Sequence, residues 1–139
     1  MSPRDTKTGN ILEQMVLPAL SQGGYTYETQ VYIGSRPSGK RHRVDVLAKD
    51  KENREYLIST KWQQVSGTAE EKVPYEVISL AEIMKEGKYQ KAYLVLGGAG
   101  WSLRDFYLTG GLDKHLIHST YVRIVSLEEF IGLANSGKL

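Results

Sequence analysis

Cysteine is absent from this 139-residue chain, which excludes disulfide bonds and thiolate-bound metal sites. Long apolar runs are also missing, and none approaches the ~20 residues that cross a membrane. The first residues, Met-Ser-Pro-Arg-Asp, lack the apolar core of a secretory signal peptide. We therefore expect a cytoplasmic protein with no membrane partner.

The chain also lacks a large excess of charge of either sign. It has 18 Lys and Arg residues and 16 Asp and Glu residues, for a net charge of +2. The overall charge therefore does not by itself indicate a nucleic-acid partner, and any basic binding surface must be local. No repeat, low-complexity segment or linker divides the chain. Its length suits one domain, residues 1–139, and its 40% apolar and 24% charged residues are ordinary for a soluble globular protein.

Periodicity and turn residues predict both helices and strands. Helices are expected at 5–21, 68–86, 102–108 and 126–135, and strands at 26–34, 41–49, 55–62, 91–97 and 121–125. Short turns favour antiparallel pairing of the first three strands, whereas helical crossovers lead into the later ones. The nearly all-apolar strand 91–97 suits a central position covered on both faces. The predicted fold class is α/β with a mixed sheet.

Two neighbouring strands carry the most informative pair of side chains. Asp45 lies within Arg-Val-Asp-Val-Leu, and Lys61 ends the run Leu-Ile-Ser-Thr-Lys sixteen residues later. Both runs alternate apolar and polar side chains as half-buried strands do, so Ser59 and Lys61 point the same way. If the strands pair as a hairpin, a carboxylate and an ammonium group can meet on one face of a sheet. A hard divalent cation needs the carboxylate, and phosphodiester chemistry benefits from the ammonium group.

This arrangement resembles the PD-(D/E)XK nuclease superfamily, whose members carry an Asp on one strand and an acid-x-Lys triplet on the next. Asp45 matches the first element, and Ser59-Thr60-Lys61 occupies the second. Val44 stands where the motif name has Pro, and Ser59 stands where an acid is expected. The order of elements over residues 5–97 also matches. The resemblance implies a restriction-endonuclease-like αβββαβ core with a mixed central sheet flanked by helices.

The resemblance also implies a metal site and a catalytic group. Asp45 and the backbone carbonyl of Thr60 would hold Mg²⁺, for which Mn²⁺ is expected to substitute. Many members place an extra acid on the opening helix, where this chain has Glu13. Lys61 would orient the attacking water and stabilise charge on the scissile phosphate. Each residue also has a purely structural interpretation. Asp45 could be exposed or paired with Arg43, and Lys61 could be an ordinary lysine at a strand end. Glu13 could be a solvated glutamate on the flank of its helix.

The acid missing at Ser59 must come from elsewhere if two metals bind. Some restriction endonucleases of the superfamily have Ser at this place and recruit a Glu from the following helix. Glu70, Glu71 and Glu76 are the candidates here. Glu70 projects closest to the apolar face of the predicted helix, with Glu71 and Glu76 flanking it, although Pro74 can break this phase. Glu70 and Glu71 are the ligands we expect, and helix-start charge that complements the dipole is the alternative.

Polar residues near this motif complete the expected site. Gln63 shares the face of Ser59 and Lys61 if the strand continues, so it could position phosphate or water; an ordinary polar strand end is the alternative. A dense basic cluster precedes Asp45 at the predicted hairpin tip. Such a cluster neutralises phosphates, whereas a merely solvated turn would have the same composition. The expected DNA-binding residues are Arg36, Lys40, Arg41 and Arg43.

The resemblance implies a metal-dependent endodeoxyribonuclease of restriction type, acting on duplex or branched DNA. A chain of this length has little room for a recognition domain, so a homodimer is expected to place two sites on opposite strands. A Holliday-junction resolvase or a homing-type nuclease of the same fold is the first alternative. A catalytically inactive DNA-binding member is the second, and an α/β domain with an accidental motif match is the third.

Overall fold

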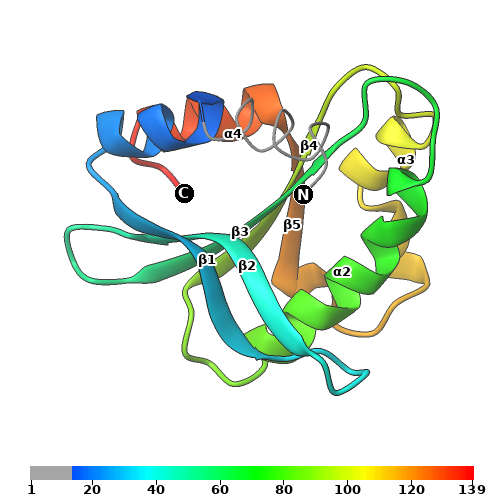
Figure 1. Ribbon diagram of the computed structural model, residues 1–139, viewed down its shortest axis with the longest axis horizontal. Helices are drawn as coiled ribbons and strands as arrows, with labels where there is room; N and C mark the ends of the chain where they lie inside the picture. The colour runs from blue at the N-terminus through cyan, green and yellow to red at the C-terminus, as the bar shows by residue number, and fades with distance from the viewer. Residues whose placement is uncertain (1–13) are drawn as a thin grey trace.

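The computed structural model describes residues 14–139, which form a five-stranded sheet with helices on both faces (Figure 1). An N-terminal helix is described over residues 14–22. The other elements are β1 (Thr26–Ser35), β2 (Arg41–Lys49), β3 (Glu55–Trp62), α2 (Ala69–Met84), β4 (Lys91–Gly97), α3 (Arg104–Leu108), β5 (Val122–Ser126) and α4 (Leu127–Asn135). Their bounds lie within two residues of the predicted ones. Two 3-10 helices, Gly111–Lys114 and Ser119–Tyr121, were not predicted.

The strands follow one another across the sheet in the order β1-β2-β3-β4-β5. The first three pair antiparallel through short turns, and β3, β4 and β5 pair parallel. Helix α2 connects β3 to β4, and α3 with the two 3-10 helices connects β4 to β5, as parallel neighbours require. The predicted α/β class with a mixed sheet is therefore confirmed.

Hydrophobic cores lie on both faces of the sheet. The N-terminal helix and α4 cover one face, where Leu20 and Phe130 are fully buried. Helix α2 covers the other face with Val73, Val77 and Leu80. Figure 1 shows these two helical layers on either side of the strands. Within residues 14–139, no helix is both long enough and apolar enough to cross a membrane.

Strand β3 differs from the half-buried strand that its alternating pattern predicts. Residues 56–59 are all buried, and the adjacent Leu57 and Ile58 pack into opposite cores. The reason is that the helical crossovers cover both faces of the sheet at β3, so neither face of this strand reaches solvent. The predicted central strand, β4, is buried on both faces as expected.

Helix α2 continues through Pro74 to Met84. A proline nitrogen carries no hydrogen, so Pro74 leaves the carbonyl of Glu70 without its usual helical donor. The hydroxyl of Tyr107 donates to that carbonyl at 2.7 Å. This bond from α3 offsets the defect within α2. At α4, Ser126 caps the helix, because its Oγ accepts a hydrogen bond from Glu129 N at 3.1 Å.

Candidate functional site

Asp45 lies where β2 separates from β3. The pairing of these strands runs from Lys49↔Glu55 to Val46↔Ile58 and stops before Asp45. Beyond that point, Asp45 Oδ2 accepts hydrogen bonds from Thr60 N at 2.7 Å and Thr60 Oγ1 at 3.0 Å. The carboxylate thus accepts the hydrogen bond that the Thr60 N–H would otherwise donate to a backbone carbonyl of the neighbouring strand. This contact holds Asp45 against the middle of the expected triplet.

A change of face along β2 directs the Asp45 side chain. Alternate residues of a regular strand share one face, yet Val44 packs in the α2 core and Val46 in the opposite core. On β1, Gln30 lies between the pairs Thr29↔Val46 and Val31↔Val44 and has a φ of 56°, which a non-glycine residue rarely adopts. Asp45 lies at this irregularity. Its half-buried side chain is therefore turned toward β3.

Glu76 of α2 reaches β3 beside Ser59. Its side chain is buried, and Oε2 accepts a hydrogen bond from Ser59 Oγ at 2.9 Å. His42 Nε2 lies 3.3 Å from the same oxygen, and Arg36 Nη1 donates to Oε1 at 2.8 Å. The α2 carboxylate therefore occupies the neighbourhood in which the triplet acid is expected. Asp45 and Glu76 contact adjacent residues of β3.

The surroundings of Glu76 keep its carboxylate ionised. Burial raises the pKa of Glu76, but the hydrogen bond from His42, the positive charge of Lys61 and the contact with Arg36 outweigh it and hold the pKa at about 2. Lys61 is half-buried and follows Ser59 by two residues on β3, so both lie on the α2 face of the sheet. The site thus combines an ionised carboxylate with nearby cations.

Glu70, expected as a metal ligand, has structural partners instead. Its carboxylate accepts hydrogen bonds from Ser102 N and from Ser102 Oγ, the latter at 2.8 Å, and from Leu103 N at 3.3 Å. Burial raises the pKa of Glu70, but these bonds and one from Gln63 lower it overall. Glu70 thus fastens the loop before α3 to α2. Glu71 is exposed. Metal ligation by these two residues stays a prediction.

Gln63 is turned toward the same loop. Its Nε2 donates to Gly100 O at 2.8 Å and to Glu70 Oε1 at 3.3 Å, and its Oε1 accepts from Ala69 N at 2.9 Å. The side chain is buried, and these bonds join the end of β3 to the start of α2. The described contacts favour a structural role, and the catalytic role stays a prediction. Glu13 lies outside the described residues.

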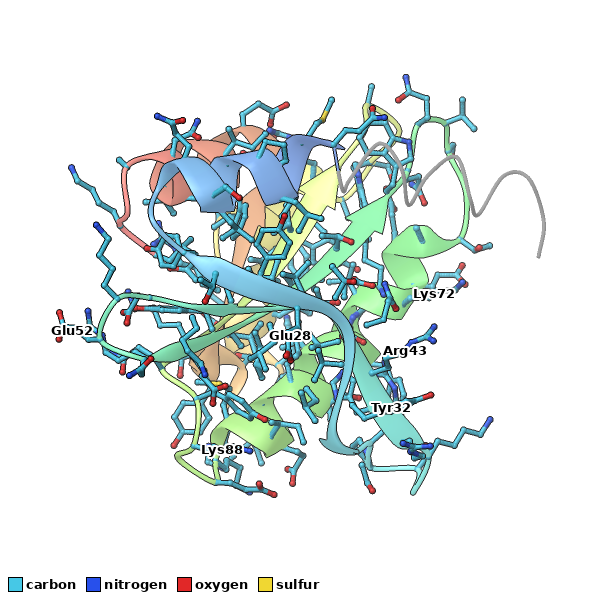
Figure 2. All side chains as sticks on the ribbon, turned by 60° about the vertical axis from the view of Figure 1, so that its left-hand side comes forward. Glu28, Tyr32, Arg43, Glu52, Lys72 and Lys88 are labelled. Carbon is cyan, nitrogen blue, oxygen red and sulfur yellow. The ribbon has the colours of Figure 1, made fainter. Side chains whose placement is uncertain are left out.

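The basic cluster divides into two parts. Arg36 is bound to Glu76, whereas Lys40, Arg41 and Arg43 are exposed. The Arg41 guanidinium lies 3.6 Å from the centre of the Tyr32 ring, a close cation–π contact. Figure 2 shows Arg43 pointing outward from β2 on the side of the molecule where α2 carries Lys72. In the described part of the chain, Arg43 forms no ion pair with Asp45.

Sequence reasoning missed the role of His42 and ranked Glu76 behind Glu70. His42 is fully buried, and its Nδ1 has no partner among residues 14–139. One signal was present in the sequence. His42 lies two residues before the apolar Val44 on the predicted strand, so the alternation of side chains places both on the same face. A second was the spacing of Glu76, three residues after Val73 and four before Leu80, which places it on the buried side of a helix.

The oxygen donors of this site suit a hard cation. Asp45 and Glu76, which contact adjacent residues of β3, would offer carboxylates to such a cation, and Thr60 would offer a backbone oxygen. No three His, Cys, Asp or Glu side chains in residues 14–139 gather as a metal-binding group. Two carboxylates with a carbonyl are nevertheless enough for Mg²⁺, which keeps several of its waters. The chemistry of these donors therefore fits a divalent metal such as Mg²⁺.

Comparison with known proteins identifies the family of this chain. The family model for the PD-(D/E)XK nuclease superfamily domain matches residues 4–138. No curated protein sequence matches the chain. The crystal structure of the protein of unknown function AF1548 is similar, with 12% sequence identity and a TM-score of 0.49 over 86% of this chain. The match covers 56% of that protein. Because the family model covers nearly the whole sequence, the chain belongs to the PD-(D/E)XK nuclease superfamily.

Proposed function

We propose that this protein is a metal-dependent endodeoxyribonuclease whose metal ligands are Asp45, Glu76 and the backbone oxygen of Thr60. One observation carries the proposal, which is the 2.9 Å hydrogen bond between Ser59 and Glu76. It brings an acid from α2 to the triplet position that Ser59 leaves without one. Superfamily membership supports a nuclease-like function, and this exchange of acids resembles the restriction endonucleases that recruit a helix glutamate.

The side chains around the site would prepare it for Mg²⁺ or Mn²⁺. The bonds from Thr60 orient the Asp45 carboxylate. N–H and C=O of one strand residue point to the same edge, so the Thr60 carbonyl faces Asp45 as well. The metal, when bound, supplies an activated water and offsets charge on the phosphate. Lys61 would place a positive charge beside the attacked phosphate.

The substrate we propose is duplex or branched DNA. The exposed Lys40, Arg41 and Arg43 on the hairpin would neutralise backbone phosphates next to the site. Restriction-type cleavage by a cytoplasmic homodimer is the reading we favour, because two copies place two sites on opposite strands. Junction resolution and homing-type cleavage need the same site and differ only in the DNA that is preferred.

A catalytically inactive DNA-binding member is the second candidate. One observation favours it, which is that Glu76 already has Arg36, His42 and Ser59 as partners within the protein. In this case, the carboxylate would serve the fold rather than a metal. The inactive protein would still bind DNA through its exposed hairpin cations, with strong dependence on salt.

Cleavage assays separate these candidates. Labelled linear duplex, supercoiled plasmid and a four-way junction are incubated with Mg²⁺ or Mn²⁺, with Asp45→Ala and Lys61→Ala as variants. Metal-dependent cutting by the wild type that both variants lose would support the nuclease, and the preferred substrate would choose among its types. Salt-sensitive binding without cutting would favour the inactive member. Absence of both would contradict the proposal.

A further inference from the structure

Arg36 fastens the β1–β2 turn to α2. Its Nη1 donates to Glu76 Oε1 at 2.8 Å, and its guanidinium lies 5.9 Å from the centre of the Tyr75 ring. Within the turn, Arg36 N donates to Lys40 O at 2.7 Å. Ser38 N donates to Tyr75 Oη at 3.3 Å. The only ion-pair partner of Arg36 among the described residues is thus the acid that we assign to the metal.

The two oxygens of Glu76 are unequally occupied. Among residues 14–139, Oε2 contacts both Ser59 and His42, whereas Oε1 contacts only Arg36. A carboxylate oxygen accepts about two hydrogen bonds, so Oε1 is the atom with capacity left. A cation that reaches Glu76 must therefore share Oε1 with Arg36 or displace it. The guanidinium and the metal ion are both positive, so the two cations repel each other.

We infer that Arg36 competes with the divalent metal for Glu76, and that a DNA phosphate relieves the competition by drawing Arg36 away. The side chain of Arg36 is 23% exposed, and Lys40 and Arg41 of the same hairpin are exposed beside it. A phosphate held by these cations could accept two parallel hydrogen bonds from the guanidinium, in a bidentate contact. Metal and DNA would then bind cooperatively. This inference rests on the proposed function.

Calorimetric titration with Mn²⁺, in the absence of DNA, tests the competition without any measure of activity. Arg36→Gln is expected to bind Mn²⁺ about tenfold more tightly than the wild type, within the usual range for coupling between two ligands. Arg36→Lys keeps the charge and is expected to stay close to the wild type. Lys40→Gln makes the same charge change in the same turn and is the matched control, with a change of less than about twofold.

DNA affinity provides the second readout. Fluorescence anisotropy with a labelled duplex, shown by gel to stay intact, is compared in EDTA and in Mn²⁺. Arg36→Gln is expected to lose about tenfold in DNA affinity with Mn²⁺ and much less in EDTA, since Glu76 holds Arg36 when no metal is present. An equal loss in both conditions would contradict the coupling. Lys40→Gln should lose a similar amount in both.

Several outcomes would overturn the inference. Unchanged or weaker Mn²⁺ binding by Arg36→Gln would mean that Arg36 prepares Glu76 for the metal or takes no part. If Arg36→Gln fails to fold, Tyr75→Ala loosens the same turn at an exposed position and should tighten Mn²⁺ binding about threefold; no change would count against the inference. Unaltered binding by Asp45→Asn and Glu76→Gln would instead refute the proposed metal site itself, and the inference with it.

Discussion

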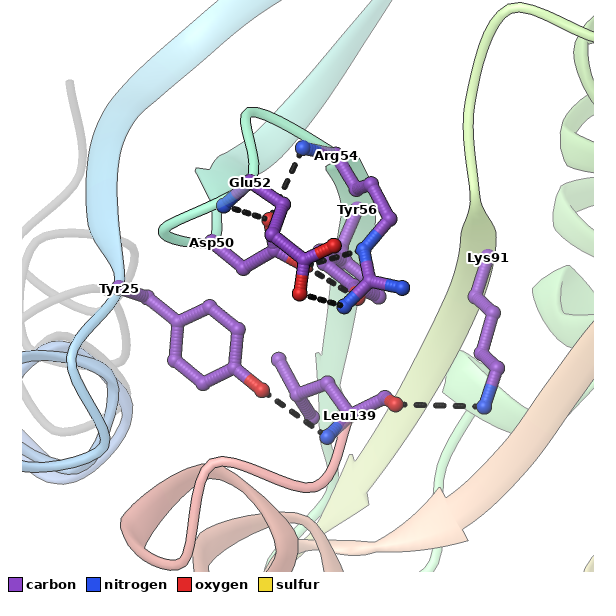
Figure 3. Close-up of polar contacts among 7 residues, drawn as sticks. All are labelled: Tyr25, Asp50, Glu52, Arg54, Tyr56, Lys91 and Leu139. Atoms are coloured by element: carbon purple, nitrogen blue, oxygen red, sulfur yellow. Dashed lines mark hydrogen bonds and ion pairs between the residues drawn. The ribbon is translucent and has the colours of Figure 1, made fainter.

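Two ionised carboxylates, Asp50 and Glu76, lie in different parts of this molecule and have different kinds of partners. Asp50 belongs to the turn between β2 and β3 and accepts hydrogen bonds from Glu52 N, Arg54 N, Arg54 Nε and Tyr56 Oη (Figure 3). All of these donors lie within six residues of Asp50. Burial raises the pKa of Asp50, but the bonds outweigh it and hold the pKa at about 2.

Glu76 reaches a pKa of about 2 by a different route. Its partners Ser59, His42 and Arg36 lie 17, 34 and 40 residues away in sequence. The side chains of Glu76 and its counter-ion Arg36 are 5% and 23% exposed, whereas those of Asp50 and its counter-ion Arg54 are 13% and 48% exposed. A similar pKa can therefore come from a local turn or from tertiary packing. Only the buried carboxylate depends on the whole fold, which is the situation typical of functional sites.

Nuclease activity should separate the two carboxylates most strongly. Glu76→Gln is expected to reduce cleavage by more than about 100-fold, because even the partners of metal ligands are worth 10- to 100-fold. Asp50→Asn removes an equal charge far from the site and should leave cleavage within about twofold of the wild type. Plasmid cleavage rates in Mg²⁺ measure both. Equal losses in the two variants would mean that Glu76 acts only through stability.

Stability should separate them next. Glu76→Ala is expected to lower the free energy of unfolding by about 3 kcal/mol, since Arg36 and His42 are left without their acceptor. Asp50→Ala should cost less, because its charged partner Arg54 is 48% exposed and can turn to water. Urea denaturation at pH 7 measures the difference. A larger loss for Asp50→Ala would reverse the comparison.

Acid should destabilise the protein through both groups. Each folded-state pKa is about 2, below the ordinary 4.5 of Glu76 and 3.8 of Asp50, so the stabilisation is complete above pH 4.5 and is lost as the pH falls toward 2. Melting temperatures between pH 7 and pH 2.5 should fall less steeply below pH 4.5 in Glu76→Gln. High salt should diminish the contribution of Asp50 more than that of Glu76. Parallel curves for wild type and Glu76→Gln would contradict this assignment.

Removal of single hydroxyl donors should give the smallest effects. Ser59→Ala takes one donor from Glu76 and is expected to cost about 1.5 kcal/mol, a usual value for a bond to a charged group. Tyr56→Phe takes one donor from Asp50, which keeps its bonds from Glu52 and Arg54, and should cost less. Urea denaturation of both variants is the measurement. A Ser59→Ala variant as stable as the wild type would indicate that its bond to Glu76 adds nothing to stability.

Much of the fold was predictable because short-range patterns decide it. Alternation, helical periodicity and turn residues placed nearly every described element, and the order of elements led to the superfamily. Long-range features were harder. The change of face at Asp45 depends on the unusual backbone of Gln30 on a neighbouring strand, and no pattern within β2 predicts it.

The sequence by itself determined the strands, their turns and the place of Ser59 and Lys61 on one face of β3. These follow from contacts over a few residues and from the alternation of side chains. Only the tertiary structure decided which acid meets Ser59. Glu70 and Glu76 are both buried on α2, but the docking of Val73 and Val77 on the sheet turns Glu76 toward β3 and leaves Glu70 to hold Ser102. The phase of the helix alone cannot decide which of the two glutamates faces Ser59. Their partners, Ser59 and Ser102, lie on distant segments that only tertiary packing brings to the helix.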